Sequence, residues 1–552
     1  MVASPLTFAA YAALATSCLS SLVFASPLKF NPTMPLGALS PLTEHHPAYG
    51  AKLKGNVAKP IIKFDPNAAR AEALEIVEAP SSTNGTQSLL RTMENTDSDL
   101  SKLEDYFKEP MERNFNVLTA QFASGASKTI PWPGSYWPTY EDGINAVWKQ
   151  GEPSASEKYA RAFGKDVKQF QDAISSRSGI LGQADNKVCT SSNDCTSLRD
   201  GSACAIRAGQ TSGVCIPTWY GICHAWAPAA ELELEPKCAT KKNGVTFRPM
   251  DIKALMTQIY NDAAIDVVFL GARFNGPDSP LNLDKYGRFN NPERRDMGPG
   301  MFHIALTNVM GKRSQAFVLD VEASSEVWNQ PVSKYEVVEA SLVDPAEASR
   351  KYYGTLKYPF NADMKNLAHM RTRVSWIVEA NEDGPLVTSG RIGAYTSTVE
   401  YEYFLELDDK FNIIGGEWLG RSNQNHPDFF WFAKAAPSLD TVTDLGMSYK
   451  DIRNLLDASI ACQDNVPGST PAPTPTTTTP NVTPAPIPTT VAPTPTTLAP
   501  APTTSQPSTQ TPAPFTKSPV TQAPGTPASK TPCPSSPVPV TSAPKTSAPV
   551  TQ

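Results

Sequence analysis

One cysteine lies where its thiol could act as a nucleophile. The stretch TWYGICHAWAPAAELEL, residues 218–234, places Cys223 two residues after Gly221 and at the start of a segment with high helical propensity. The unpaired N–H groups and the dipole at a helix N-terminus stabilise an anion, and they lower the pKa of a thiol below its free value of about 8.5. Gly221 gives the backbone room to approach a substrate. These residues predict a reactive thiolate at Cys223, with a buried structural thiol as the alternative.

The cysteine count also favours a free thiol. Of nine cysteines, Cys18 lies in an apolar N-terminal segment and Cys533 in a Pro/Thr-rich tail. The remaining seven are Cys189, Cys195, Cys204, Cys215, Cys223, Cys238 and Cys462. Because seven is odd, at least one thiol stays unpaired in an oxidising compartment, unless Cys533 completes a fourth bridge. We predict two disulfides among the first four, with the pairing open, and a long-range bridge between Cys238 and Cys462. Zinc is the less favoured alternative for these thiols because their spacing is irregular.

A thiolate nucleophile needs a base that exchanges its proton, and histidine is the commonest choice. The chain has six histidines: His45, His46, His224, His303, His369 and His426. The first two lie in a predicted pro-segment. His224 would project from a different side of the helix than Cys223, and His369 resembles a residue on a helix surface. The candidates are therefore His303 and, second, His426.

The surroundings of His303 favour it as the base. The stretch FHIALTNV, residues 302–309, predicts a strand, and QAFVLDVE, residues 315–322, predicts its hairpin neighbour. Such a hairpin would place His303 beside Asp320, where a carboxylate can orient the imidazole. We therefore predict a Cys223–His303–Asp320 triad.

Composition divides the chain into four parts. Residues 1–25 are apolar, with Val23 and Ala25 at the −3 and −1 positions of a cleavage site, which predicts a secretory signal peptide. Residues 26–100 are polar, carry a glycosylation sequon at Asn84, and are expected to be a pro-segment or flexible arm. Residues 101–466 form the predicted catalytic body. Residues 467–552 are rich in Pro, Thr and Ser and predict a disordered, mucin-like stalk.

The predicted body is an α+β domain. Helical spacing dominates its first part, as in RPMDIKALMTQIYNDAAI, residues 248–265. Alternating strands dominate its later part, as in YTSTVEYEYFLELDDKFNIIGGEWLG, residues 395–420. The net charge is −6 with no basic cluster, which argues against nucleic acid or an anionic membrane as a partner. No apolar run after the signal is long enough to span a bilayer.

The order of Cys, His and Asp, and the sequence GICHAW, resemble papain-like enzymes. Those proteases carry a glutamine shortly before the cysteine to bind the oxyanion, whereas this chain has CIPTWYG, residues 215–221, at that place. The backbone N–H of Cys223 and the indole N–H of Trp219 are the candidate oxyanion donors. Trp219 and Trp226 are also candidate walls of the substrate site.

The stretch EVWNQPVSKYEVVE, residues 326–339, resembles the elicitor peptide of the secreted oomycete transglutaminase elicitor family. The matching residues are Val327, Trp328, Asn329, Gln330, Pro331 and Val332, and the family's Arg-Gly-Phe-Lys is replaced by residues 333–336. The resemblance implies a papain-like fold, an active cysteine at Cys223 and a surface segment at 327–339 that a plant immune receptor recognises. It also implies calcium-dependent protein-glutamine γ-glutamyltransferase activity, with no calcium ligands that we can name.

The expected chemistry is a thioester at Cys223, made from a protein glutamine and resolved by a protein lysine. Trp328 would cover the predicted His303–Asp320 hydrogen bond.

The stalk suggests cell-wall polysaccharide or protein as a partner and a secreted, wall-associated location. The alternatives are a papain-like cysteine protease with the same triad and a non-catalytic cell-wall structural protein.

Overall fold

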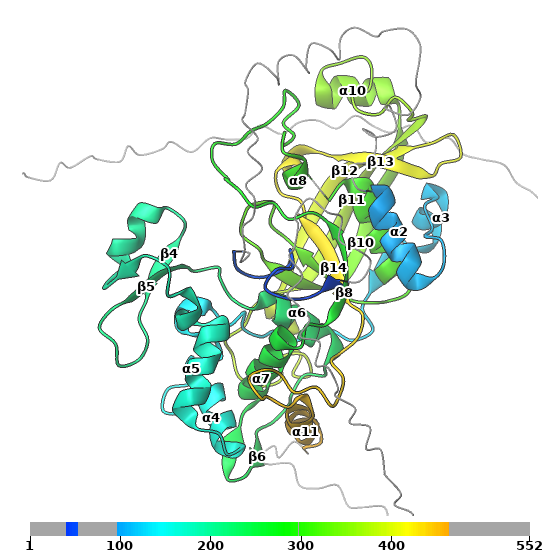
Figure 1. The fold of residues 1–552 in the computed structure, drawn as a ribbon. Helices are drawn as coiled ribbons and strands as arrows, with labels where there is room; N and C mark the ends of the chain where they lie inside the picture. Colours follow the sequence, from blue (N-terminus) through cyan, green and yellow to red (C-terminus); the bar gives the residue numbers. More distant parts are fainter. Residues whose placement is uncertain (1–39, 53–95, 296, 463–552) are drawn as a thin grey trace, which may run out of the picture. The chain divides into compact units, whose positions relative to one another are not determined.

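The computed structural model describes residues 40–52 and 96–462 with the exception of residue 296 (Figure 1). The chain divides into two units, Met1–Ser469 and Thr470–Gln552, and only the first contains described residues. The predicted signal peptide, the sequon at Asn84 and the stalk also lie outside them. Within the described ranges, no helix is long and apolar enough to cross a membrane.

The body is built on a nine-stranded antiparallel sheet. The strand order is β1-β8-β14-β9-β10-β11-β12-β13, and the short β2 pairs with β10 beside this path. The strands are β1 (Ser40–Pro41), β2 (Ser124–Ala126), β8 (Asp266–Gly271), β9 (Phe317–Asp320), β10 (Asn329–Val343), β11 (Asn366–Ile377), β12 (Thr396–Leu407), β13 (Ile413–Trp418) and β14 (Phe429–Ala433). Most of these strands follow residue 265, which confirms the predicted antiparallel sheet in the later part of the chain.

Helices cover both faces of the centre of this sheet. In β8, Val267 and Phe269 contribute to one apolar core, whereas the alternate residues Val268 and Leu270 contribute to a second. The first core contains residues of α4 (Ala155–Ala162), α5 (Val167–Ser178), α6 (Cys223–Leu232), α7 (Pro249–Asp262) and α11 (Tyr449–Ile460). The second contains residues of α2 (Thr96–Phe107), α3 (Phe115–Gln121) and α9 (Pro299–Leu306). Figure 1 shows α6 and α7 below β8 and β14, with α2 and α3 to their right.

The predicted strand around His303 is wrong. Residues 299–306 form α9, which continues as a π-helical turn over Thr307–Gly311. Every residue of α9 is buried, so the apolar run has no periodicity that separates a strand from a buried helix. Pro299 at the first helical position was the available helix signal. The prediction for β9 is confirmed, but its neighbours are β10 and β14 rather than a strand containing His303.

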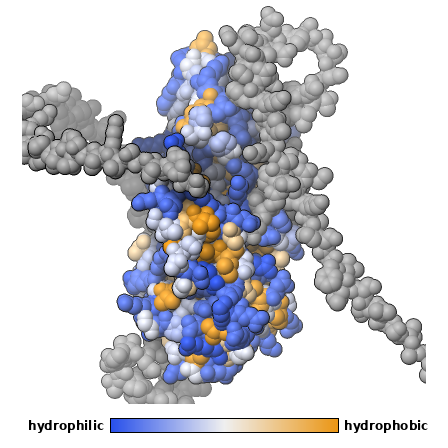
Figure 2. Space-filling model, turned by 60° about the vertical axis from the view of Figure 1, so that its left-hand side comes forward, coloured by the Kyte–Doolittle hydropathy of each residue, from blue (hydrophilic) through white to orange (hydrophobic). Residues whose placement is uncertain are grey.

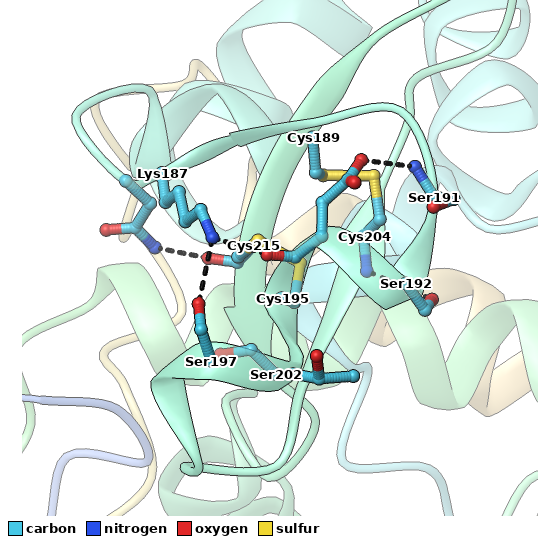
Figure 3. The surroundings of a disulfide bond; sticks show 12 residues. Lys187, Cys189, Ser191, Ser192, Cys195, Ser197, Ser202, Cys204 and Cys215 are labelled. Carbon is cyan, nitrogen blue, oxygen red and sulfur yellow. Dashed lines mark hydrogen bonds between the residues drawn. A yellow bond between two sulfur atoms is a disulfide. The ribbon is translucent and has the colours of Figure 1, made fainter. Parts of the chain in front are cut away.

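The cysteine-rich insert carries the two predicted disulfides, and their pairing is Cys189–Cys204 and Cys195–Cys215 (Figure 3). They tie together a small sheet of β3 (Val188–Cys189), β5 (Gly213–Pro217) and β4 (Ser202–Ala205). Val188 remains 69% exposed and Leu198 42% exposed, so the insert buries little apolar surface of its own. Figure 2, which turns this side forward, shows a largely hydrophilic face with apolar residues in separate groups. Covalent bridges therefore supply order that a core would supply elsewhere.

The remaining elements complete the body. They are α8 (Pro292–Arg295), α10 (Pro345–Tyr353) and the two-stranded sheet of β6 (Thr240–Lys242) and β7 (Val245–Phe247). The predicted Cys238–Cys462 bridge is confirmed, and it joins the chain after α6 to the residues that follow α11. The bridge thus holds the last helix of the body against the core that supports α6.

We expect loss of this bridge to destabilise the body. The double variant Cys238→Ser/Cys462→Ser should lose about 2–5 kcal/mol of unfolding free energy, measured by urea denaturation. The matched control is Cys189→Ser/Cys204→Ser, whose bridge spans 15 residues instead of 224. In the chain-entropy model the control should lose less. Equal losses in the two variants would contradict this account.

Candidate active site

Cys223 is the first residue of α6, as the sequence predicts. It is the free cysteine among the residues that the structure describes, and it is 1% exposed. The N–H of Ile222 donates to the carbonyl of Tyr136 at 2.7 Å. A Cβ at Gly221 would lie 2.5 Å from that same carbonyl oxygen, so only glycine permits this approach. The contact with Tyr136 therefore fixes where α6 begins and where the sulfur lies.

The sulfur has two polar neighbours from the start of β10. The side-chain amide of Asn329 donates from Nδ2 to the Cys223 Sγ at 3.3 Å. The thiol in turn donates to the carbonyl of Val327 at 3.6 Å. Trp431 on β14 donates from Nε1 to the Asn329 Oδ1 at 2.8 Å, so the amide can present only its NH₂ group to the sulfur. This arrangement would stabilise a thiolate once it forms.

A single peptide group separates the thiol from a buried carboxyl. The Val327 carbonyl accepts from Cys223, and the N–H of the next residue, Trp328, donates to the Asp320 Oδ1 at 2.9 Å. The other carboxyl oxygen of Asp320 is buried with no hydrogen-bond partner in the described part of the chain. Burial raises the pKa of Asp320 to about 8. Hydrogen bonds from the main-chain N–H groups of Trp328 and Glu322, and the positive charge of the nearby Arg273, oppose this shift. Asp320 can therefore gain or lose a proton near neutral pH.

The effect of burial on the pKa of the Cys223 thiol outweighs the effect of the helix N-terminus. Burial raises the pKa of the Cys223 thiol to about 11, against the lowering effect of Asn329. Glu379 and Asp320 add further upward shifts through their negative charges. The predicted low pKa is therefore wrong for this arrangement, in which the thiol is protonated at neutral pH. The reason is desolvation, which disfavours a charge more strongly than a helix dipole favours it.

The structure does not bring His303 to the thiol. α9 and α6 contribute to the cores on opposite faces of the sheet. The His303 Nδ1 lies 2.8 Å from the Tyr403 hydroxyl, and its Nε2 is buried without a partner among the described residues. The predicted side-by-side placement of His303 and Asp320 is wrong, and so is the hydrogen bond between them.

The three other histidines of the body are also engaged elsewhere. His369 lies on strand β11 rather than on a helix surface, and its ring nitrogens lie 3.0 Å from Glu339 and 2.9 Å from Glu402. The ring nitrogens of His426 lie 2.9 Å from the Ser422 carbonyl and 3.1 Å from the Arg294 carbonyl. The ring of His426 stacks on Trp418. His224 accepts at Nδ1 from a backbone N–H, so its Nε2 carries the proton and donates to Asn261 at 3.0 Å. Within residues 40–52 and 96–462, no histidine is hydrogen-bonded to Cys223.

The three predicted tryptophans have different environments. Trp226 is fully buried, and its Nε1 donates to the carbonyl of Trp132, so it belongs to the core rather than to a substrate wall. Trp219 is half-buried with its ring against Tyr220. Trp328 is half-buried, and its ring meets the edge of Tyr136 near the N-terminus of α6. Trp328 is thus the one of the three with direct bonds to site residues.

The elicitor-like segment is not a surface segment over its first six residues. Asn329 and Val332 have no exposed surface, Val327 is 1% exposed, and Gln330 is 4% exposed and donates to Glu379. Exposure begins only at Lys334 and Glu336. The expectation of a surface segment is therefore wrong for residues 327–332, because the start of β10 lies between the two cores. The role of Asn329 at the sulfur was missed, because no local pattern links it to a cysteine 106 residues earlier in the chain.

The described residues do not form an evident calcium site. Their one close group of possible metal ligands is Cys189, Cys195 and Cys215, and these sulfurs are in disulfides. Calcium prefers six to eight oxygen ligands, which this group does not offer. The calcium requirement implied by the resemblance stays a prediction, and no chemical step below depends on it.

Comparisons with known proteins identify relatives of the body. The model of a family described as transglutaminase elicitor matches residues 99–462. The crystal structure of the GP42 transglutaminase from Phytophthora sojae is similar at 48% identity, with a TM-score of 0.60. The similarity covers 66% of this chain and 99% of that one. A search of curated proteins found no match.

We expect Asp320 to make the stability of the protein depend on pH. Its native pKa of about 8 exceeds the unfolded value of 3.8, so the native state binds the proton more tightly. The free energy of unfolding should therefore fall as the pH rises from about 4 to about 8. Asp320→Asn cannot titrate and should lose less stability over this range, by about 1 kcal/mol or more, because one pKa unit corresponds to about 1.4 kcal/mol.

Urea denaturation at pH 5 and pH 8 measures this difference. The control is Asp440→Asn, which changes an exposed carboxylate and should keep the wild-type pH dependence. The same pH dependence in Asp320→Asn and wild type would show that Asp320 does not titrate in this range.

Proposed function

The chain belongs to the transglutaminase elicitor family and is a protein-glutamine γ-glutamyltransferase, and we propose that Cys223 is its nucleophile. The observation that carries this proposal is the position of Cys223. It is unpaired, it begins α6, and its sulfur receives a hydrogen bond from an amide whose orientation Trp431 fixes. These features suit a thiol that must become an anion and attack a carbonyl carbon.

The reaction proceeds by two acyl transfers. The Cys223 thiolate attacks the side-chain amide carbon of a protein glutamine and forms a tetrahedral intermediate. The C–N bond then breaks, ammonia leaves with the proton from the thiol, and a thioester remains. A lysine amine attacks the thioester, forms an isopeptide bond and returns the thiol. Water in place of the amine gives glutamate.

The donors beside the sulfur suit the oxyanion of the intermediate. The backbone N–H groups of Cys223 and His224, the first two residues of α6, have no acceptor within the helix. The Asn329 amide donates a hydrogen bond to the sulfur itself. One well-placed donor contributes about 3–4 kcal/mol to such a transition state. The sequence predicts the indole N–H of Trp219 as a further oxyanion donor. The support for this role is that Trp219 lies close to the start of α6 in the chain.

We assign proton transfer to Asp320 in place of His303. Asp320 is linked to Cys223 through the Val327–Trp328 peptide group, and its raised pKa lies near the working pH of a general base. His303 lies on the opposite side of the sheet and His426 is bonded to two carbonyls.

We extend the proposal to the setting of the enzyme. The apolar N-terminus and the disulfides favour an extracellular location, and the Pro/Thr-rich tail suits anchorage in a cell wall. Protein glutamine and lysine side chains of wall proteins are the proposed substrates. Recognition by a plant immune receptor would need residues 327–332 to leave their buried positions, so the intact fold would hide this segment.

Amine incorporation tests the proposed reaction. With casein and a fluorescent primary amine, the active enzyme should label casein, and Cys223→Ala should abolish labelling because the thioester cannot form. The same assay with a chelator tests the calcium prediction. Casein fragments without labelling would favour a cysteine protease. A folded protein whose Cys223 stays unreactive toward iodoacetamide in every form, intact or proteolytically trimmed, would favour a non-catalytic role.

The Asn329 amide should matter for turnover. Asn329→Ala removes the donor at the sulfur, so we expect kcat for amine incorporation to fall by about 10²–10³-fold, as for one lost oxyanion donor. Asn366→Ala is the matched control, because Asn366 also begins a strand but bonds to the carbonyl of Asp408. The control should keep wild-type kcat. A kcat within about twofold of wild type in Asn329→Ala would remove Asn329 from the mechanism.

A further inference from the structure

The N-terminal segment, residues 40–52, packs over the candidate active site. Its first two residues, as β1, extend the sheet at the edge strand β8, and Leu42 donates to the carbonyl of Ile265 at 2.8 Å. His46 is buried with its ring edge against Phe269. The segment then crosses the N-terminus of α6, where Figure 1 shows it in dark blue beside α6 and β8. It lies outside residues 99–462, the part of the chain that the family shares.

Five consecutive carbonyl groups of this segment accept hydrogen bonds from the body. The Arg273 guanidinium donates to the carbonyls of Pro47 at 3.1 Å, Tyr49 at 2.9 Å and Ala51 at 3.0 Å. The Asn329 side-chain amide donates to the carbonyl of Ala48 at 2.8 Å. The backbone N–H of Gly221 donates to the carbonyl of Gly50 at 2.9 Å. All of these acceptors are main-chain atoms. These main-chain contacts could hold other peptides as well, whereas the buried side chains of Leu42, His46 and Tyr49 add contacts that are specific to this segment.

Arg273 is the centre of this binding. Its guanidinium is buried, and it interacts electrostatically with Asp320 and Cys223 as well as with the three carbonyls. A buried guanidinium needs partners, and the segment supplies most of them. A glutamine-containing peptide that follows the same main-chain path could supply the same carbonyls.

Gly50 lies directly against the nucleophile. A Cβ at this position would be 2.9 Å from the Cys223 Sγ and 2.6 Å from the Gly221 carbonyl oxygen. The N–H of Gly50 donates to the His224 Nδ1 at 2.9 Å. The backbone of Gly50 does not require a left-handed conformation, so glycine is needed here for space alone. A side chain at residue 50 and the docked segment are therefore incompatible.

The docked segment is incompatible with acyl transfer as well. It occupies the Asn329 amide and the Gly221 N–H, two donors beside the sulfur. It also seals the thiol from solvent, in keeping with the raised pKa of Cys223. A substrate carbonyl must reach within about 3–3.5 Å of the sulfur to react, and that space is filled.

We propose that residues 40–52 are a built-in inhibitor that occupies the acyl-donor site and keeps the enzyme latent until the segment is displaced or cut from the body. This inference rests on the proposed function, because it names the regulation of the same site. While the segment is covalently joined to the body, its effective concentration is high and it competes with substrate peptides. Cleavage between residues 52 and 96 would make it a free peptide that dilution removes.

Gly50→Ala in the full chain tests the proposal without a change in the body. The alanine Cβ would clash only in the docked state, so the segment should lift from the site. We expect iodoacetamide to label Cys223 at least about tenfold faster than in wild type, as followed by mass spectrometry, and casein labelling to rise in parallel. Lys52→Ala, which alters an exposed side chain of the same segment, is the matched control and should behave as wild type. A synthetic peptide of residues 40–52 should slow both reactions of Gly50→Ala.

A second variant reaches the same state by cleavage. A protease site inserted after Ala73 of the full chain should leave Cys223 protected before the cut and expose it after the cut and dilution. Wild-type labelling rates in both Gly50→Ala and the cut protein would overturn the inference. So would intact wild type that incorporates amine as fast as Gly50→Ala, although that result would support the transferase function. Fast labelling of Cys223 without amine incorporation would support the inhibitory segment and contradict the proposed function.

Discussion

The active site depends on the contact between the start of α6 and the start of β10, where the Asn329 amide meets the Cys223 sulfur. Each partner is held from outside this contact. Tyr136 fixes the turn before α6, and Trp431 on β14 fixes the orientation of the amide. Both α6 and Trp431 belong to the core that covers one face of the sheet, so the packing of that core determines the geometry of the thiol. A loosened core would therefore affect reactivity before it affected the overall fold.

The same contact explains why residues 327–332, apart from the half-buried Trp328, are buried. This segment supplies the carbonyl that accepts from the thiol, the N–H that binds Asp320 and the amide that faces the sulfur. The segment that resembles an elicitor peptide is thus part of the candidate catalytic centre. Its sequence is constrained by that role, whatever a receptor recognises. Residues 333–336, where the chain departs from the family peptide, lie where exposure begins, outside these contacts.

Two opposing electrostatic effects act on Cys223. The helix terminus and the Asn329 amide favour a thiolate, whereas desolvation favours the neutral thiol and dominates in the described arrangement. Solvent entry on removal of the N-terminal segment would weaken desolvation but leave the two favourable interactions in place. Latency and reactivity can therefore arise from the same residues, with the hydration of the site as the difference between them.

The sequence by itself determined the free cysteine at a helix start, the presence of the disulfides and the antiparallel sheet. These follow from an odd cysteine count, the helical propensity after Cys223 and alternating strands, all of which are local patterns. Only the tertiary structure decided that α9 places His303 on the far side of the sheet, that Asn329 meets a sulfur 106 residues away and that Gly50 lies against a helix 174 residues further along the chain. Short-range periodicity indicates whether a segment forms a helix or a strand and which of its faces is buried. Which distant elements meet is decided by how two cores pack on one sheet, and no local spacing encodes that.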